Sequence, residues 1–245
     1  MTAMWTTWRR EVKAYGGLFA CYLPGVAFLA AAGWTFVAIL RYYEGNVLPV
    51  QAIWGLAVAP WLPVLCAMLT MRLFAEERAS GMIELLMSAP VREREFVIGK
   101  FLAALTVTVL VVSVSALLPM AVLPWMSEAV SDAIHRTEFA VTWGVLVLQG
   151  AVWCAAGLMV SVCFRNQTLA AAGTLVLCGG IPVAVYAAVL AWVPSVRMSM
   201  AWQPLLMHVY EFSTGLVSTA VIVLYVALTA LFLFVCSKVL AGLRL

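Results

Sequence analysis

Six long apolar segments follow one another along this chain, separated by short stretches that carry almost all of its charge. They are Ala14–Leu40, Gly45–Met71, Phe101–Ser127, Phe139–Phe164, Asn166–Val196 and Phe212–Ser237. A helix needs about 20 apolar residues to cross the hydrocarbon core of a membrane, and each segment reaches that length. A charge at the centre of a spanning helix costs roughly 2.5–3.5 kcal/mol, so uninterrupted runs of this length are strong signals. The pattern predicts an all-α membrane protein with six transmembrane helices, forming a single transmembrane domain over residues 1–245.

Composition supports this class and excludes others. The chain is 65% hydrophobic and 10% charged, with a mean hydropathy of +1.06, whereas about a quarter of the residues in soluble domains are charged. No long polar block remains for a globular domain. The net charge of +3 is too small to favour nucleic-acid binding. The six cysteines lie in or beside apolar runs without CxxC spacing, which favours plain packing.

The placement of Lys and Arg predicts which ends of the spans face the cytoplasm. Basic residues concentrate in cytoplasmic segments of membrane proteins. With a cytoplasmic N-terminus, only Arg41, Arg136 and Arg197 of the 14 Lys and Arg residues fall on the outer side. Both termini and the charged segment between the second and third spans are therefore expected to face the cytoplasm.

That charged segment, residues 72–100, is the most distinctive part of the chain. It holds five of the 14 Lys and Arg and five of the 11 Asp and Glu. The second span is expected to continue as helix to Ala79 and to end at Ser80–Gly81, because Gly ends helices at little cost. A short amphipathic helix, Met82–Ser88, should follow before Pro90. Its apolar face could dock into a groove on a partner protein or lie back on the membrane surface.

The N-terminal segment, residues 1–16, predicts an amphipathic helix lying in the membrane interface. One face gathers its apolar residues and the adjoining face gathers its basic ones. The residues concerned are Met4, Trp5, Trp8, Val12 and Tyr15 on the first face and Arg9, Arg10 and Lys13 on the second. A simple anchor that only fixes topology explains the same pattern. Gly16–Gly17 offers a bend into the first span.

Polar residues and prolines inside the spans are few. Gln149 and Thr174 are expected to make helix-packing hydrogen bonds rather than to bind substrate. Pro60, Pro63, Pro119 and Pro182 are expected to mark kinks or breaks in the spanning helices.

Three runs resemble the ABC transporter permeases of the ABC-2 type, closest to the gliding-motility and nitrous-oxide-reductase-maturation branch. Residues 76–91 read EERASGMIELLMSAPV and residues 95–101 read EFVIGKF, which match that signature except at Met82, where Thr is usual. Residues 9–15 also resemble the branch, although Gly16–Gly17 departs from it. A third match is the run 204–215.

The resemblance implies a type V exporter-like arrangement. Six spans form one half of a dimer with a second, identical or related permease, and two copies of a separate ABC ATPase supply the energy. The N-terminal interfacial helix acts as a connecting helix, the 72–100 loop carries a coupling helix that docks on the ATPase, and short re-entrant helices in the external segment 194–215 precede span 6. Carried over in this way, the expected coupling residues are Glu76, Glu77, Arg78, Gly81, Glu84, Leu85, Leu86 and Pro90. The external gate candidates are His208, Glu211 and Phe212. The bacterial inner membrane is the implied location.

The absence of an ATP-binding motif and of charged residues in the spans indicates that the energy source lies outside this chain. No GxxxxGK[ST] sequence occurs: Gly99–Lys100 is preceded five positions earlier by Arg94 and followed by Phe101. We therefore expect the chain to bind no cofactor, with ATP and Mg²⁺ held by the partner ATPase. The six windows also lack ionisable residues, which argues against an ion-coupled carrier.

Two other functions compete with transport. An intramembrane hydrolase is disfavoured because His135 and His208 are the only histidines and no GxSxG or HExxH motif occurs. A membrane scaffold that anchors an ATPase for mechanical work, without moving a solute, shares every feature above. A periplasmic or additional membrane partner would narrow the cargo, which the sequence does not identify.

Overall fold

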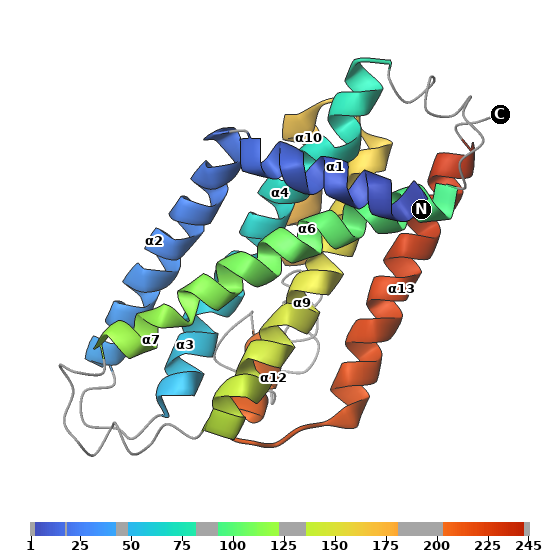
Figure 1. The fold of residues 1–245 in the computed structure, drawn as a ribbon. Coiled ribbons are helices and arrows are strands. Elements are labelled where there is room, and N and C mark those ends of the chain that lie inside the picture. The colour runs from blue at the N-terminus through green and yellow to red at the C-terminus, as the bar shows by residue number, and fades with distance from the viewer. Residues whose placement is uncertain are drawn as a thin grey trace.

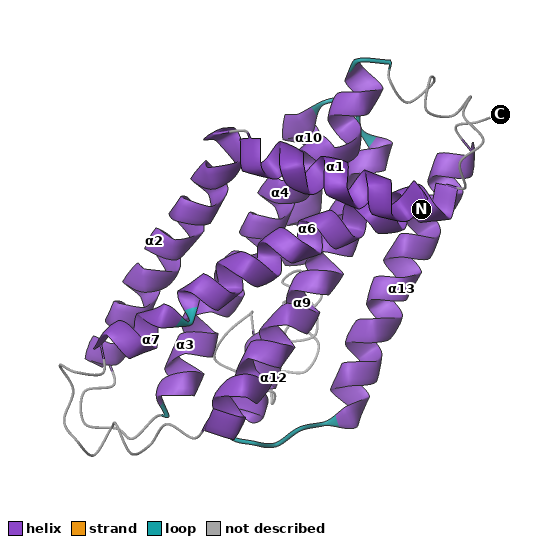
Figure 2. Ribbon diagram, viewed as in Figure 1, coloured by secondary structure: helices purple, strands orange, loops and turns teal. Residues whose placement is uncertain are grey.

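The computed structural model describes residues 3–17, 19–42, 49–81, 93–122, 136–180 and 203–242. All regular structure in these ranges is helical (Figure 2). The helices are α1 (Ala3–Gly17), α2 (Phe19–Tyr42), α3 (Val50–Val58), η1 (Ala59–Trp61), α4 (Leu62–Ala79), α6 (Glu93–Ser115), α7 (Leu117–Val122), α9 (Arg136–Cys163), α10 (Gln167–Leu175), η3 (Val176–Gly180), α12 (Gln203–Ser213) and α13 (Thr219–Gly242).

The long helices form a bundle, and α1 lies across one end of it (Figure 1). The end of α4, the start of α6 and the ends of α9 and α13 lie at this same end, which we call the α1 end. The short helix α12 lies at the opposite end, beside the start of α9 (Figure 1). The first four described spans thus alternate in direction, whereas α9 and α13 both end at the α1 end (Figure 1).

Five described helical segments are long and apolar enough to cross a membrane. They are Tyr22–Tyr42, Val50–Ala79, Glu93–Met120, Thr137–Cys163 and Thr219–Gly242. Each corresponds to one of the predicted windows. The remaining window, Asn166–Val196, is described only as far as Gly180, where α10 and η3 form a shorter apolar helix.

Breaks within the helices follow the prolines and glycines. Pro60 lies in η1, a single 3-10 turn that divides the second span into α3 and α4, which confirms a break there. α4 ends at Ala79, and Gly81 follows with a φ of 70°, so the predicted end at Ser80–Gly81 is also confirmed. Pro182 lies outside the described residues.

The last window corresponds to two helices rather than one. α12 ends at Ser213, Gly215 has a φ of 83°, and the spanning helix α13 begins only at Thr219. The charge-free window Phe212–Ser237 therefore includes the end of α12 and the turn as well as most of the spanning helix. A charge-free window does not reveal an uncharged turn.

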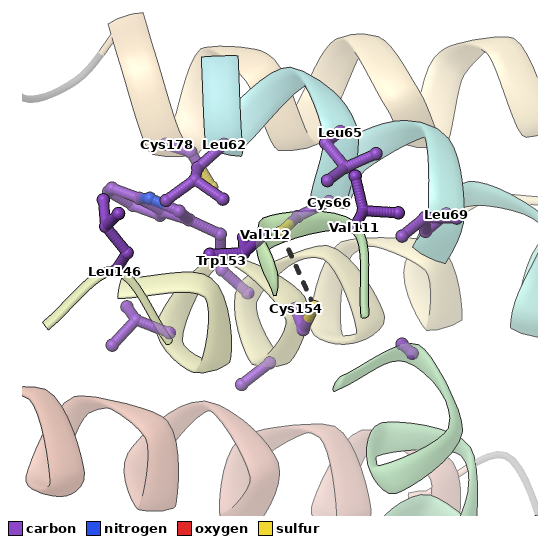
Figure 3. Close-up of a cluster of buried hydrophobic side chains, with 14 of the residues drawn as sticks. Leu62, Leu65, Cys66, Leu69, Val111, Val112, Leu146, Trp153, Cys154 and Cys178 are labelled. Carbon is purple, nitrogen blue, oxygen red and sulfur yellow. Dashed lines mark hydrogen bonds between the residues drawn. The ribbon is translucent and has the colours of Figure 1, made fainter. Parts of the chain in front are cut away.

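The core lies where α4, α6 and α9 pack together. In Figure 3, Leu62 of α4 lies toward Trp153 of α9, and Leu65 and Leu69 of α4 lie on the side of Val111 of α6. Small residues bring α4 and α9 close. A Cβ atom built on Gly157 would lie 2.1 Å from Thr70 Oγ1, so no larger residue fits there without a shift. These two helices therefore pack as one unit.

Candidate coupling site

A tight helix crossing holds α1 against α6 at the α1 end of the bundle. A Cβ atom on Gly99 would come within 2.8 Å of the Met4 carbonyl oxygen and 2.9 Å of Thr7 Cβ. Backbone cannot yield as a flexible side chain can, so this approach requires glycine. Trp8 adds a second link, because its indole Nε1–H donates to Thr106 Oγ1 of α6 at 3.2 Å.

Lys100 follows Gly99 and joins three helices. Its side chain is only 1% exposed. The Nζ atom lies 3.1 Å from Glu11 Oε1 of α1 and 2.9 Å from Glu77 Oε1 of α4, and it donates to the Leu73 carbonyl of α4 at 2.5 Å. All three ammonium donors therefore have an acceptor.

Aromatic rings enclose the same ammonium group. Lys100 Nζ lies 5.0 Å from the ring centroids of both Phe74 and Phe96, within cation–π range. The two rings meet edge to face with centroids 5.9 Å apart. Because the charge is desolvated here, loss of either carboxylate partner would be costly.

Arg10 completes a closed ring of four charges with Lys100, Glu11 and Glu77. Its Nη2 atom lies 2.7 Å from Glu11 Oε1 and 2.9 Å from Glu77 Oε1. Burial alone would raise the pKa of Glu11, but Lys100 and Arg10 outweigh it and hold that pKa below its usual value. Burial lowers the pKa of Arg10, and Glu11 and Glu77 more than offset that effect, so it is raised. Opposite charges therefore alternate around this ring.

The apolar face predicted for α1 is largely used for packing on the protein. Tyr15 is buried and its hydroxyl donates to the Leu69 carbonyl of α4 at 2.8 Å. Trp8 and Val12 pack against the core. Of the two tryptophans, Trp5 is 40% exposed and stacks on Trp8, with ring centroids 4.3 Å apart.

The basic face of α1 is open. Arg9 lies over the Trp5 ring, 5.6 Å from its centroid, and both Arg9 and Lys13 are exposed. Contact of this face with a membrane surface stays a prediction.

The predicted coupling residues of α4 take different positions. Glu77 faces the charged ring, whereas Glu76 is 55% exposed and pairs with Arg72 at 3.4 Å. Arg78 donates through Nη1 to the Val162 carbonyl of α9. Gly81 lies just past the end of α4 and is the last residue described before Glu93. Glu84, Leu85, Leu86 and Pro90 lie outside the described residues.

A serine strengthens the connection from α4 to α9. Ser161 Oγ of α9 accepts hydrogen bonds from the backbone N–H groups of Phe74 and Ala75 at 3.3 and 3.2 Å, and it donates to the Met71 carbonyl at 3.2 Å. With Arg78, this gives α4 polar contacts to α9 as well as to α1 and α6.

The three gate candidates lie at the opposite end of the bundle, on α12. Phe212 is buried, and His208 Nδ1 lies 3.1 Å from the Tyr225 hydroxyl of α13. Burial lowers the pKa of His208, and the nearby Glu211 carboxylate only partly opposes this shift. The Tyr225 hydroxyl also accepts from Gln149 Nε2 of α9 at 3.2 Å, so the predicted packing role of Gln149 is confirmed. These residues link α12 to two spans.

Lys100, Glu11 and Gly99 were not among the predicted site residues. A signal existed in the sequence, because Lys100 is the last charge before a long apolar run and a lysine at that depth needs a carboxylate partner. The matching carboxylate, Glu11, sits among three basic residues near the N-terminus. A helix-packing hydrogen bond was also predicted for Thr174. Its hydroxyl instead donates to the Ala170 carbonyl of its own helix at 2.8 Å.

Comparison with known proteins gives one family. Residues 24–186, about two thirds of the chain, match the family model described as ABC-2 family transporter protein. The match begins within α2 and extends past η3. A search of curated proteins found no match.

Proposed function

Because the chain belongs to the ABC-2 family of transporter proteins, and is thus a membrane permease subunit of an ABC transporter, we propose that it couples ATP hydrolysis by a separate subunit to export of a substrate. The ATPase belongs on another chain in this family, and no GxxxxGK[ST] sequence occurs here. Energy must therefore enter through a contact between proteins.

The Lys100 contact set is the observation that carries this proposal. Residues 82–92, where the ATPase contact is proposed, lie between the end of α4 and the start of α6. Lys100 ties both flanking helices to α1 through Glu77 and Glu11. A displacement of this segment would consequently move α4, α6 and α1 together, and Ser161 and Arg78 would pass the motion to α9.

The proposed assembly is a dimer with two ATPase subunits, formed by two copies of this chain or by this chain and a related permease. It sits in a bacterial inner membrane with both termini and the α1 end in the cytoplasm. α1 serves as the connecting helix, and α12, with His208, Glu211 and Phe212, belongs to the external gate. Assignment to the gliding-motility or nitrous-oxide-reductase-maturation branch belongs to this proposal as well.

Substitutions in the coupling segment test this function. Glu84→Lys and Leu85→Asp should weaken capture of the ATPase and abolish its stimulation by the permease, because they alter the charge and the apolar face expected to meet it. Arg165→Glu, a charge reversal in the turn between α9 and α10 at the same end, is the matched control. Normal capture and normal stimulated hydrolysis by both variants would rule out this coupling assignment.

A membrane scaffold would give the same ATPase result. Transport by the reconstituted complex separates the two functions, since ATP-dependent movement of a solute into sealed inside-out vesicles is expected only of an exporter.

A further inference from the structure

One side of α1 carries a row of three exposed side chains. Trp5, Arg9 and Lys13 are spaced four positions apart, so they follow one another along the helix, about 6 Å apart at each step. The guanidinium carbon of Arg9 lies over the Trp5 ring, 5.6 Å from its centroid. We call these three residues the Trp5 row. It presents two cations and an aromatic ring to the surroundings of the protein.

The two cations of the Trp5 row have no ion-pair partner within the chain. Among the described residues, no carboxylate lies within ion-pair distance of Arg9 or Lys13. Their neighbour Arg10 differs, because it pairs with both Glu11 and Glu77. The charge of the Trp5 row is therefore available to an anion from outside the chain.

Hydrogen bonds place α1 at the boundary of the apolar spans. Trp8 donates to Thr106 of α6 at 3.2 Å, and Thr106 lies inside the third charge-free window. Tyr15 donates to the Leu69 carbonyl of α4 at 2.8 Å, inside the second charge-free window. Both contacts lie close to the charged ends of those windows. α1 is therefore level with the place where the hydrocarbon of a membrane meets the lipid headgroups.

The apolar face predicted to meet the membrane is occupied. Trp8 and Val12 pack against the core, and Tyr15 is buried against α4. The Trp5 row lies beside this face and remains exposed. Contact between α1 and the membrane therefore falls to the Trp5 row, which is charged, rather than to a purely apolar surface.

We propose that the Trp5 row binds the phosphate groups of anionic phospholipids. The Trp5 ring lies where headgroups meet acyl chains, the depth that tryptophan favours in membranes. Arg9 and Lys13 donate to the phosphate oxygens beside it. A phospholipid with a net negative charge is preferred to a zwitterionic one, because it carries no ammonium group that opposes the two cations. In the orientation proposed above, these lipids belong to the cytoplasmic leaflet.

Photocrosslinking of the full chain in nanodiscs tests this contact. The discs contain equal parts phosphatidylglycerol and phosphatidylcholine. A trace of one or the other lipid carries a diazirine near the carbonyl end of an acyl chain, and adducts on residues 3–17 are quantified by peptide mass spectrometry. We expect phosphatidylglycerol to label this segment at least about fivefold more than phosphatidylcholine, the value of one basic residue near an anionic surface.

Substitutions in the Trp5 row identify the source of the preference. Arg9→Gln combined with Lys13→Gln should remove it, whereas Arg9→Lys combined with Lys13→Arg should retain it, because the charge is unchanged. Arg165→Gln removes an exposed arginine from the turn between α9 and α10 and is the matched control. It should leave labelling of residues 3–17 as in the wild type. Size-exclusion profiles check that each variant is folded.

Two results would overturn the proposal. One is equal labelling of the wild type by both lipids; weaker capture of the ATPase by the double glutamine variant would then assign the Trp5 row to an acidic surface of that subunit. The other is a preference that survives in the double glutamine variant. The measurement needs no ATPase, and both leaflets of the disc carry the same lipids. Its failure would therefore leave the proposed coupling function and orientation standing.

Discussion

Replacement of Lys100 by methionine should destabilise the protein strongly. Methionine retains most of the apolar stem that packs between Phe74 and Phe96, so the substitution chiefly removes the charge. Glu11 and Glu77 are then left with Arg10 alone, although their side chains are only 12% and 15% exposed. Removal of one partner from a buried ion pair costs about 3–5 kcal/mol. Since 1 kcal/mol shifts the melting temperature of a chain of this size by about 2–4 °C, the expected fall is roughly 6–20 °C.

A double-mutant cycle identifies the cause of that loss. Lys100→Met, Glu77→Gln and the double variant are compared by thermal unfolding in detergent, at one scan rate because such unfolding is often irreversible. The double variant should lose clearly less than the sum of the two single losses, because Arg10 can then neutralise the one remaining carboxylate, Glu11. Lys13→Met, which removes an exposed lysine from α1, should change stability by less than about 0.5 kcal/mol. Additivity within about 0.5 kcal/mol, or a Lys100→Met loss no larger than the control, would refute the reasoning.

Three further predictions follow from other contacts. Gly99→Ala should lower stability by about 1–3 kcal/mol in thermal unfolding, because its Cβ would meet the backbone of α1. Gly144→Ala faces open space and should not lower stability. Equal effects of the two substitutions would contradict the close crossing of α1 and α6. The pKa of Glu11 is lowered in the folded protein, so its ionised form contributes stability above the ordinary value of 4.5, and that stability is lost as pH falls through the folded-state pKa. Glu11→Gln should therefore flatten the acid limb of a plot of melting temperature against pH. An unchanged limb would be inconsistent with the pairing. The Cys66 and Cys154 Sγ atoms lie 3.6 Å apart between α4 and α9 (Figure 3). A membrane-permeable oxidant should therefore remove two protons and two electrons and join them in a disulfide, which peptide mass spectrometry detects. ATP-driven activity should survive if the two helices move as a unit, and its loss would show that they must separate.

The sequence predicts the spans and their breaks because those depend on local properties. Charge-free windows locate the membrane segments, and Gly81 ends α4 where the helix-breaking residues occur. The charge-free window alone does not mark the turn before α13, because the turn contains no charge; Gly215 lies in it with a φ of 83°. Local signals of hydropathy and backbone freedom therefore fix the elements but not every boundary between them.

The candidate coupling site depends on contacts that no local signal specifies. Lys100 contacts residues 89 and 23 positions away in the chain, and its significance appears only when α1 is placed across the bundle. The family signature singled out Glu77 and the Gly99–Lys100 pair without assigning the latter a role. The structure supplies that role: glycine for the helix crossing and lysine for the link between three helices.

ATP hydrolysis by the purified complex tests the central claim most directly. The Lys100→Met/Glu77→Gln variant, in which the link is removed and its partner neutralised, is co-expressed with the ATPase and compared with the wild type in nanodiscs. The account predicts that the complex assembles normally but that stimulation of hydrolysis by the permease falls at least about tenfold, a loss of about 1.4 kcal/mol in coupling. Wild-type stimulation by an assembled complex would show that motion of the coupling segment does not pass through Lys100.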